Sequence, residues 1–350
     1  MGVSFREVTK RFADGTTALD RLNLQFDQGE FIVLLGPSGS GKTTACRLLA
    51  GLEKSSDGRI EIDGKDITNL PPRLRGIGMV FQNYALYSHK SVFENIAYPL
   101  HIRKVGKADI DSRVKSIAEL LQIGKYLHRK PAQLSGGQAQ RVAVARALVW
   151  EPTICVMDEP LSNLDALLRL HMRTELNRLY RRLGKTFVFV THDQEEAMTL
   201  ATRIAVLKDG KLVQFDEPRT IYRKPSNRFV AEFMGRPAMN TFEGTVENGI
   251  FRAGDIACPV ECPEGPITLG IRPEQIELTE AGTRDAMSLG LDVKELIEPE
   301  ALLIFQNGSS SLTVRTQKNC DHVGSGQSIG LRFPKEALHY FDAKTGERLR

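Results

Sequence analysis

One glycine-rich segment of the chain reads Gly36-Pro37-Ser38-Gly39-Ser40-Gly41-Lys42-Thr43. The run before it, Phe31–Leu35, is short, apolar and partly β-branched, which predicts a buried strand, and the residues from Cys46 to Ala50 predict a helix. The first amide groups of a helix lack intrahelical partners and lie at the positive end of its dipole, so they can bind a polyphosphate. The segment therefore predicts a phosphate-binding loop between a strand and a helix.

Two side chains of this loop indicate a nucleotide as the ligand. In the P-loop arrangement, Lys42 would reach the β- and γ-phosphates and the Thr43 hydroxyl would ligate Mg²⁺. We add Thr44, the next residue, to the predicted nucleotide contacts. An ordinary glycine-rich turn is the alternative, but the strand before the loop and the helix after it favour nucleotide binding.

Length and composition favour a globular protein with two domains. The 350 residues exceed the usual size of one core, and 41% apolar content is ordinary. The net charge of +4 is too balanced to indicate nucleic acid as a partner.

Five irregularly placed cysteines favour a reducing compartment, and no second pair follows Cys258 and Cys262 at zinc-site spacing. No apolar stretch approaches the ~20 residues of a membrane span, so we expect a cytosolic chain or one docked on a membrane protein.

The residues around the loop predict an antiparallel β-portion. Val3–Val8 alternates weakly, the segment Leu22–Phe26 follows an Asp-Gly turn, and Arg59–Ile62 lies between two further Asp-Gly turns. Phe12 lies on the loop before the phosphate-binding loop. It can stack on an adenine face or pack on its hairpin neighbours, and its position leaves both open.

A glutamine and a helical segment come next. The apolar run Gly76–Phe81 predicts a buried strand that ends at Gln82, where a polar side chain can touch the metal or the attacking water. A plain loop glutamine is the alternative. Helical spacing from Val92 to about Tyr126 predicts an inserted helical subdomain, which we place at about residues 90–150.

The pentapeptide Leu134-Ser135-Gly136-Gly137-Gln138 opens another predicted helix. Ser135 and Gln138 have the spacing of a capping box, so an ordinary helix start is one interpretation. Two consecutive glycines weaken the first turn of a helix, which favours a role in letting a ligand approach the bare amides. The pentapeptide therefore predicts a second anion site.

Carboxylates and a histidine follow two more predicted strands. Thr153–Met157 predicts a strand that ends at Asp158 and Glu159, and ligands of open α/β sheets gather at the carboxyl ends of strands. Asp158 can hold Mg²⁺ through water, while Glu159 points elsewhere and can polarise the attacking water. Asp165 precedes an amphipathic helix and can simply be its N-cap. A lone histidine is usually structural, but His192 follows the strand Thr186–Thr191 at the sheet edge expected for the loop and the carboxylates, so a contact with the γ-phosphate is preferred.

In this order, the motifs resemble those of the ABC transporter ATPase family over roughly the first 235 residues. The likeness rests on a P-loop at Gly36–Thr43, a Q-loop at Gln82, a signature at Leu134–Gln138, a Walker B strand ending at Asp158-Glu159, a D-loop at Ser162–Asp165 and a switch histidine at His192. The resemblance implies an α/β P-loop NTPase core with an antiparallel β-portion and a helical insert in residues 1–235.

The resemblance also implies roles. ATP held by Lys42 and Thr43 of one copy would be covered by Ser135, Gly136 and Gly137 of a second copy, with Gln138 in the same signature. Glu159 would be the general base, Gln82 and His192 would sense the γ-phosphate, and Asp165 would link the two sites. Gln82 would also contact Mg²⁺. Phe12 falls where the family places its adenine-stacking aromatic, although tyrosine or tryptophan is common there, and Ala139 replaces a bulkier polar residue.

A closer likeness is to the carbohydrate-uptake importer ATPases of maltose type. It rests on Pro160–Asp165, His192–Met198, Phe229–Gly235 and Met239-Asn240. Related importers for polyamines, iron or sulfate share many of these motifs and remain alternatives. An ABC ATPase acting on ribosomes or nucleic acid is a further alternative. The importer likeness implies a homodimer, two transmembrane permease subunits, an external solute-binding protein and a peripheral location on the cytoplasmic face of the bacterial inner membrane.

Residues 236–350 predict a separate all-β domain. The dipeptide Asn248-Gly249, between two short apolar runs, indicates a type I′ hairpin. Gly270–Glu274 is similar to the oligonucleotide-binding-like regulatory domain of the importer ATPases, but Glu298–Ala301 replaces a segment where that family often has glycine. Because no basic-aromatic stripe is evident, dimer contacts or regulation are preferred to RNA binding.

Overall fold

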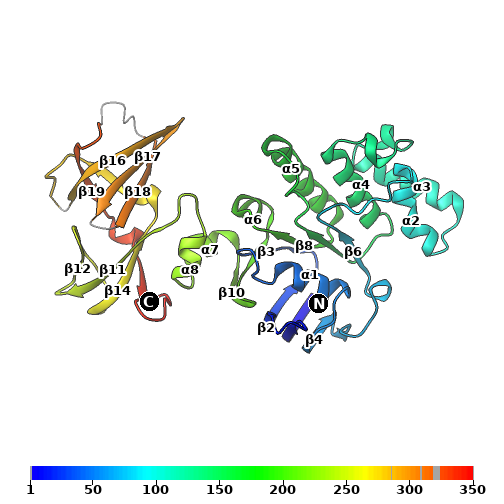
Figure 1. Cartoon of the computed structure of the whole chain (residues 1–350), viewed down its shortest axis with the longest axis horizontal. Coiled ribbons are helices and arrows are strands. Elements are labelled where there is room, and N and C mark those ends of the chain that lie inside the picture. The colour runs from blue at the N-terminus through cyan, green and yellow to red at the C-terminus, as the bar shows by residue number, and fades with distance from the viewer. Residues whose placement is uncertain (1, 285, 308–309, 318–323, 350) are drawn as a thin grey trace. The chain divides into compact units, whose positions relative to one another are not determined.

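The computed structural model describes residues 2–284, 286–307, 310–317 and 324–349, which form two compact units, Met1–Arg219 and Thr220–Arg350 (Figure 1). The second unit starts before residue 236, where the sequence placed the boundary. It includes α7 (Pro218–Arg223) from Thr220 onward and α8 (Arg228–Phe233). Arg272 of the same unit donates hydrogen bonds to the carbonyls of Tyr222, Ala231 and Met234, which ties these helices to the strands that follow.

A six-stranded sheet forms the centre of the first unit. Its order is β10-β9-β3-β8-β7-β6, parallel except for the β9–β10 hairpin. The strands are β3 (Phe31–Leu35), β6 (Ile77–Val80), β7 (Ile154–Asp158), β8 (Thr186–Thr191), β9 (Arg203–Lys208) and β10 (Lys211–Asp216). Every residue of β3, β7 and β8 is buried because both faces of the sheet are covered.

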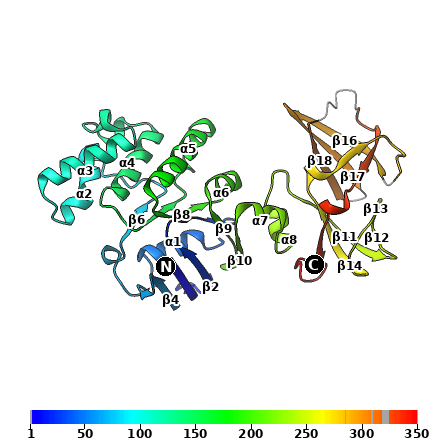
Figure 2. The same cartoon turned by 180° about the vertical axis from the view of Figure 1, so that it is seen from behind.

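Different elements cover the two faces of this sheet. Ile32 and Leu34 of β3 share an apolar cluster with α1 (Lys42–Ala50) and with the four-stranded sheet β2-β1-β4-β5. Phe31 of β3 packs instead against Tyr180 of α5 (Ala166–Leu183), with ring centroids 5.2 Å apart. Figures 1 and 2 show α1 on one side, and α5 with α6 (Gln194–Leu200) on the other. The β-portion comprises β1 (Gly2–Arg11), β2 (Thr17–Asp27), β4 (Asp57–Ile62) and β5 (Lys65–Asp66).

The predicted helical insert contains α2 (Val92–Ile102), α3 (Lys107–Leu120) and α4 (Gly136–Leu148). Val114 and Ile117 of α3 are buried, as their helical spacing predicted. Helix α2 starts with a capping box between Ser91 and Glu94. Short 3-10 helices lie at Pro72–Leu74, Gly124–Tyr126, Pro131–Gln133, Pro273–Gln275 and Lys335–Ala337. None of the helices in the described part of the chain is long and apolar enough to cross a membrane.

The second unit is all-β apart from short helices, which confirms the predicted class. One antiparallel sheet has the order β13-β12-β11-β14-β20 and the other β15-β19-β16-β17-β18. Asn248 and Gly249 have φ of 52° and 71°, as a type I′ turn requires between β11 and β12. The strands are β11 (Asn240–Glu247), β12 (Ile250–Ala253), β13 (Ile256–Pro259), β14 (Gly265–Ile271), β15 (Glu277–Thr279), β16 (Met287–Ile297), β17 (Glu300–Asn307), β18 (Ser310–Thr316), β19 (Ser328–Arg332) and β20 (His339–Asp342). Of the five cysteines, Cys46, Cys155 and Cys258 are buried, and Cys320 lies outside the described residues.

Candidate nucleotide site

The predicted phosphate-binding loop joins β3 to α1. Gly41 is the N-cap residue of α1 with φ of 97°, and no side chain caps the helix. A Cβ atom on Gly36 would lie 2.2 Å from the Leu207 carbonyl oxygen, and one on Gly41 would lie 2.4 Å from that of Ala18. Glycine is therefore required at both positions, and the first amides of α1 are free of side-chain caps.

Lys42 folds back into this loop. Its ammonium donates hydrogen bonds to the carbonyl oxygens of Gly36 and Pro37 at 2.9 and 2.8 Å, and the residue is only 5% exposed. Burial lowers the pKa of Lys42, although the charges of Glu159 and Asp158 oppose this shift. A cation is thus held where the loop can present it to phosphate oxygens.

Thr43 and Asp158 meet at the end of β7. The Thr43 hydroxyl donates a 2.9 Å hydrogen bond to the Asp158 carboxylate. Burial raises the pKa of Asp158, and the hydrogen bond from Thr43 opposes that shift. A buried carboxylate beside a hydroxyl is an all-oxygen donor set of the kind Mg²⁺ prefers, so these two residues fit the predicted metal.

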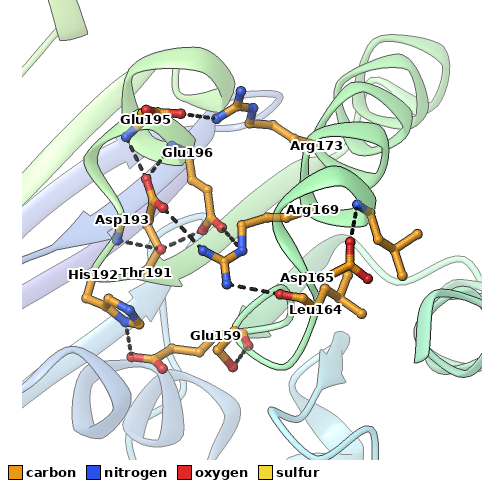
Figure 3. A network of polar contacts seen from close by, with 12 residues as sticks. Glu159, Leu164, Asp165, Arg169, Arg173, Thr191, His192, Asp193, Glu195 and Glu196 are labelled. Atoms are coloured by element: carbon orange, nitrogen blue, oxygen red, sulfur yellow. Dashed lines mark hydrogen bonds and ion pairs between the residues drawn. The ribbon is translucent and has the colours of Figure 1, made fainter. Parts of the chain in front are cut away.

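Glu159 contacts two residues that follow other strands of the sheet. Its carboxylate accepts a 3.2 Å hydrogen bond from the Gln82 amide nitrogen and lies 3.4 Å from His192 Nδ1 (Figure 3 shows the His192 contact). Glu159 has φ of 43°, a left-handed conformation in which a non-glycine residue is uncommon. Glu159 takes this conformation directly after β7. Its carboxylate contacts Gln82 and His192, whereas that of Asp158 contacts Thr43, so the two side chains point to different groups, as predicted.

Ser162 and Asn163 support the same cluster through contacts that the sequence analysis did not assign. The Ser162 hydroxyl donates to the Glu159 carbonyl oxygen at 2.9 Å. The Asn163 amide donates to the Gln82 carbonyl oxygen at 3.1 Å. The segment after β7 is therefore hydrogen-bonded to the loop that carries Gln82. Within the described chain, Asp165 is the N-cap of α5, because its carboxylate accepts from the Leu168 amide at 2.8 Å.

The signature pentapeptide forms the start of α4. Ser135 and Gln138 make the predicted capping box, with the Ser135 amide donating to Gln138 Oε1 at 3.1 Å. A Cβ atom on Gly137 would lie 3.0 Å from the side chain of Leu168, and one on Gly136 would lie 3.2 Å from Leu164. Both glycines thus lie close to leucine side chains at and just before the start of α5, a contact that the sequence alone did not reveal. Ser135 and Gly136 are exposed.

Phe12 and Thr44 complete the predicted contacts. Phe12 is 39% exposed in the turn after β1, and the Lys10 ammonium lies 4.9 Å from its ring centroid. Its ring is therefore only partly packed on neighbours. Thr44 is half-buried in the first turn of α1.

Two arginines near the site were not identified from the sequence. Arg146 of α4 donates to the carbonyl oxygens of Tyr84 and Ala85, two consecutive residues with positive φ in the loop after Gln82. Arg169 of α5 lies in a polar network with residues that follow β8 (Figure 3). Because Tyr84 and Ala85 are distant in sequence from Arg146, and Asp193 and Glu196 from Arg169, no local pattern marks these contacts.

Comparisons with known proteins agree with this geometry. A family model described as ABC transporter matches residues 19–162. UgpC of Salmonella typhi, an sn-glycerol-3-phosphate import ATP-binding protein, is 44% identical over 99% of both chains. MsmX of Bacillus subtilis (strain 168), an oligosaccharides import ATP-binding protein, is 43% identical over 95% of both chains.

Solved structures are similar to part of the chain. The ATP-binding cassette MJ0796, dimeric and bound to ADP and Pi in a post-hydrolysis state, is 34% identical with a TM-score of 0.57, over 62% of this chain and 99% of that one. CbiO1 of Clostridium perfringens, part of the ABC transporter complex cbiONQ, is 30% identical with a TM-score of 0.58, over 63% of this chain and 89% of that one. The family expected from the sequence is therefore confirmed. The chain belongs to the ATP-binding proteins of ABC transporters and is an ATPase.

Proposed function

We propose that the chain hydrolyses MgATP to drive the import of a carbohydrate or carbohydrate-like solute through separate permease subunits. The observation that carries the catalytic part is the convergence at one edge of the sheet, where Glu159 contacts both Gln82 and His192 while Thr43 contacts Asp158. The solute class is supported by the names of UgpC and MsmX, which import sn-glycerol-3-phosphate and oligosaccharides.

Each residue of this cluster has a role in the proposal. The amides of the loop at residues 36–43 and the Lys42 ammonium bind the phosphates. Thr43, Asp158 and Gln82 hold Mg²⁺, which neutralises phosphate charge when bound. Glu159 accepts a proton from the attacking water, and its contacts with Gln82 and His192 keep the carboxylate oriented toward that water. Phe12 and Thr44 contribute nucleotide contacts.

A second copy of the chain completes the site in this proposal. Ser135 and Gly136 are exposed at the uncovered start of α4, where they can meet the ATP of another copy. Gly137 and Gln138 belong to the same turn, and Asp165 lies on the adjoining segment. The cassette MJ0796 is dimeric, and the comparison covers 99% of its chain, which supports this pairing.

A groove on the first unit fits a membrane partner. It has a volume of about 720 Å³ and is lined by residues of α2, α4 and the loop after Gln82. Leu74 and Ile102 on its border are 61% and 65% exposed, and Tyr87 and Arg146 also line it. We assign this groove to the permease subunits, so that the chain lies on the cytoplasmic face of the bacterial inner membrane. Solute selection then belongs to the permeases and an external binding protein.

The catalytic part is tested with Glu159→Gln in the full-length protein. Loss of the general base should lower kcat by about 10³-fold, while nucleotide affinity is retained. Light scattering after size-exclusion chromatography should show dimers of the variant in MgATP. The control is Glu119→Gln, because Glu119 is exposed on α3. Hydrolysis at the normal rate by Glu159→Gln, or monomers alone in MgATP, would contradict the mechanism.

The solute class is tested by uptake in a strain that lacks the gene. Complementation with wild type, but not with Glu159→Gln, should restore uptake of labelled sugars or sugar phosphates from a panel. Polyamine and iron uptake should be the same with both. Restoration of polyamine or iron uptake instead would reject a carbohydrate importer while leaving the ATPase assignment intact.

A further inference from the structure

Arg169 lies between the segment after β7 and the segment after β8. It is in the first turn of α5, and its guanidinium donates a 3.1 Å hydrogen bond to the Leu164 carbonyl oxygen. The same guanidinium lies 3.6 Å from the Asp193 carboxylate and 3.9 Å from that of Glu196. Figure 3 shows Arg169 extended between these two sides.

The partners of Arg169 are themselves bonded to the backbone around His192. Glu196 accepts a 2.6 Å hydrogen bond from the Thr191 hydroxyl, which in turn accepts from the Asp193 amide at 2.9 Å. Asp193 also caps α6 by accepting from the amides of Glu195 and Glu196. The residues on either side of His192 are thus fixed by groups that Arg169 contacts.

The cavity at this place shows how near Arg169 is to the catalytic cluster. It is lined by Arg169, Glu159 and His192 together with Ser162, Thr191 and Glu196. Its volume is about 10 Å³, at the lower limit for a single water molecule. Arg169 thus lines the same small cavity as His192 and Glu159, so a change at Arg169 alters the surroundings of both.

Arg173 provides a contrast on the same helix. It lies one turn further along α5 and pairs with Glu195 of α6 at 3.3 Å. The Arg173 side chain is 15% exposed, but its partner Glu195 is 70% exposed, so solvent screens the pair and we expect it to contribute little. Both arginines join α5 to α6, but among their described contacts only those of Arg169 reach the Leu164 carbonyl and the cavity shared with Glu159.

We propose that Arg169 is a positioning residue for ATP hydrolysis: it holds the Leu164 segment and the Thr191–Glu196 segment together, and thereby keeps His192 in contact with Glu159. This inference rests on the proposed function, in which Glu159 activates water. The described side-chain contacts of Arg169 are with Leu164, Asp193 and Glu196. In this proposal it acts through them on the rate of the chemical step and not on nucleotide affinity.

The test compares kcat and KM for MgATP in full-length wild type, Arg169→Ala, Arg169→Lys and Arg173→Ala. Misplacement of the cluster should lower kcat of Arg169→Ala about tenfold, with KM changed by less than about twofold. Lysine keeps the charge but not the planar fork, so Arg169→Lys should recover about half of the loss on a logarithmic scale. Arg173→Ala should stay within about twofold of wild type in both constants.

A double-mutant cycle with His192→Ala separates positioning from a general structural effect. If Arg169 acts through His192, adding Arg169→Ala to His192→Ala should lower the single-turnover rate by less than about twofold. A further tenfold loss, or a normal kcat for Arg169→Ala, would overturn the proposal. Melting curves control for folding, and Arg169→Lys supplies the readout if the alanine variant is unfolded. Glu159→Gln in the same assay distinguishes the hypotheses, because normal hydrolysis by that variant rejects the proposed function itself.

Discussion

Each unit buries a cation against backbone carbonyls, and the two cations differ in what else surrounds them. Lys42 in the first unit is 5% exposed and Arg272 in the second is 2% exposed. Burial lowers the pKa of both. Lys42 lies beside the carboxylates of Asp158 and Glu159, in a loop whose outer residues are open to solvent. Arg272 is closed in by three carbonyls and by the ring of Tyr222, 4.0 Å from its guanidinium carbon.

The difference teaches that burial alone does not identify a functional charge. The loop around Lys42 offers free helix amides and carboxylates to an external ligand, so changes there should alter activity. Three carbonyls around Arg272 accept hydrogen bonds from its terminal nitrogens, and its buried Nε has no hydrogen-bond partner among the described residues. These described contacts offer no carboxylate or free helix amide to an external ligand, so changes there should alter stability. Trp150, the only tryptophan of the chain, belongs to the first unit, so its fluorescence reports the unfolding of that unit.

The largest expected effect is that of Lys42→Ala. Loss of the ammonium that faces the phosphates should lower ATP hydrolysis by about 10³-fold and weaken nucleotide binding. The free energy of unfolding from Trp150 fluorescence should change by about 1 kcal/mol or less. Lys54→Ala, at an exposed lysine after α1, is the control. Normal hydrolysis by Lys42→Ala would remove the basis of the comparison.

Arg272→Met should have the opposite pattern. Removing the guanidinium leaves the carbonyls of Tyr222, Ala231 and Met234 without this donor, which should destabilise the second unit by about 3 kcal/mol. Hydrogen exchange in β14 and β20 measures this loss, with Arg252→Met, at the exposed position of β12, as the control. The rate of ATP hydrolysis and the unfolding transition measured by Trp150 fluorescence should stay near those of wild type. Unchanged exchange in the second unit would contradict a structural role.

His339 should give the second unit a smaller, pH-dependent effect. Burial, with the charges of Arg348 and Arg272, lowers the pKa of His339 from 6.5 to about 4, and Arg348 lies 3.0 Å from its Nδ1. The unfolded chain therefore takes up the proton first as the pH falls, so stability is present above pH 6.5 and is lost toward pH 4.

The measurement is hydrogen exchange of β20 between pH 6.5 and pH 5, corrected for the intrinsic exchange rate. The loss in wild type should reach about 2 kcal/mol over this range. His339→Gln keeps a side-chain acceptor for Arg348 but does not titrate, so its stability should vary less with pH. An equal pH dependence in both proteins would show that His339 is not responsible.

The sequence is most informative where the predicted feature lies within a contiguous segment. The loop at residues 36–43 was predicted because its glycines, lysine and threonine are adjacent and because the runs on either side have clear periodicity. The capping box of Ser135 and Gln138 was likewise visible at its spacing. The packing of Gly137 on Leu168 was not, because that contact joins two helices that are separate in the sequence.

Contacts between distant segments were beyond the sequence for a physical reason. Arg169 and its partners Asp193 and Glu196 lie on different helices, and Arg272 holds carbonyls well before it in the chain. The early start of the second unit follows from the same kind of contact. Side-chain hydrogen bonds carry no sequence periodicity, so a lone arginine in a polar segment cannot be distinguished from a solvated one.

The sequence by itself determined the glycine-rich loop between a strand and a helix, the strands that end at Asp158 and Thr191, and the all-β character of the second unit, because local periodicity and turn residues specify these. Only the tertiary structure decided that Thr43 bonds to Asp158 and that Glu159 lies between Gln82 and His192. Those contacts depend on the order of the strands in the sheet, which brings the carboxyl ends of parallel strands to one edge and is fixed by packing on both faces.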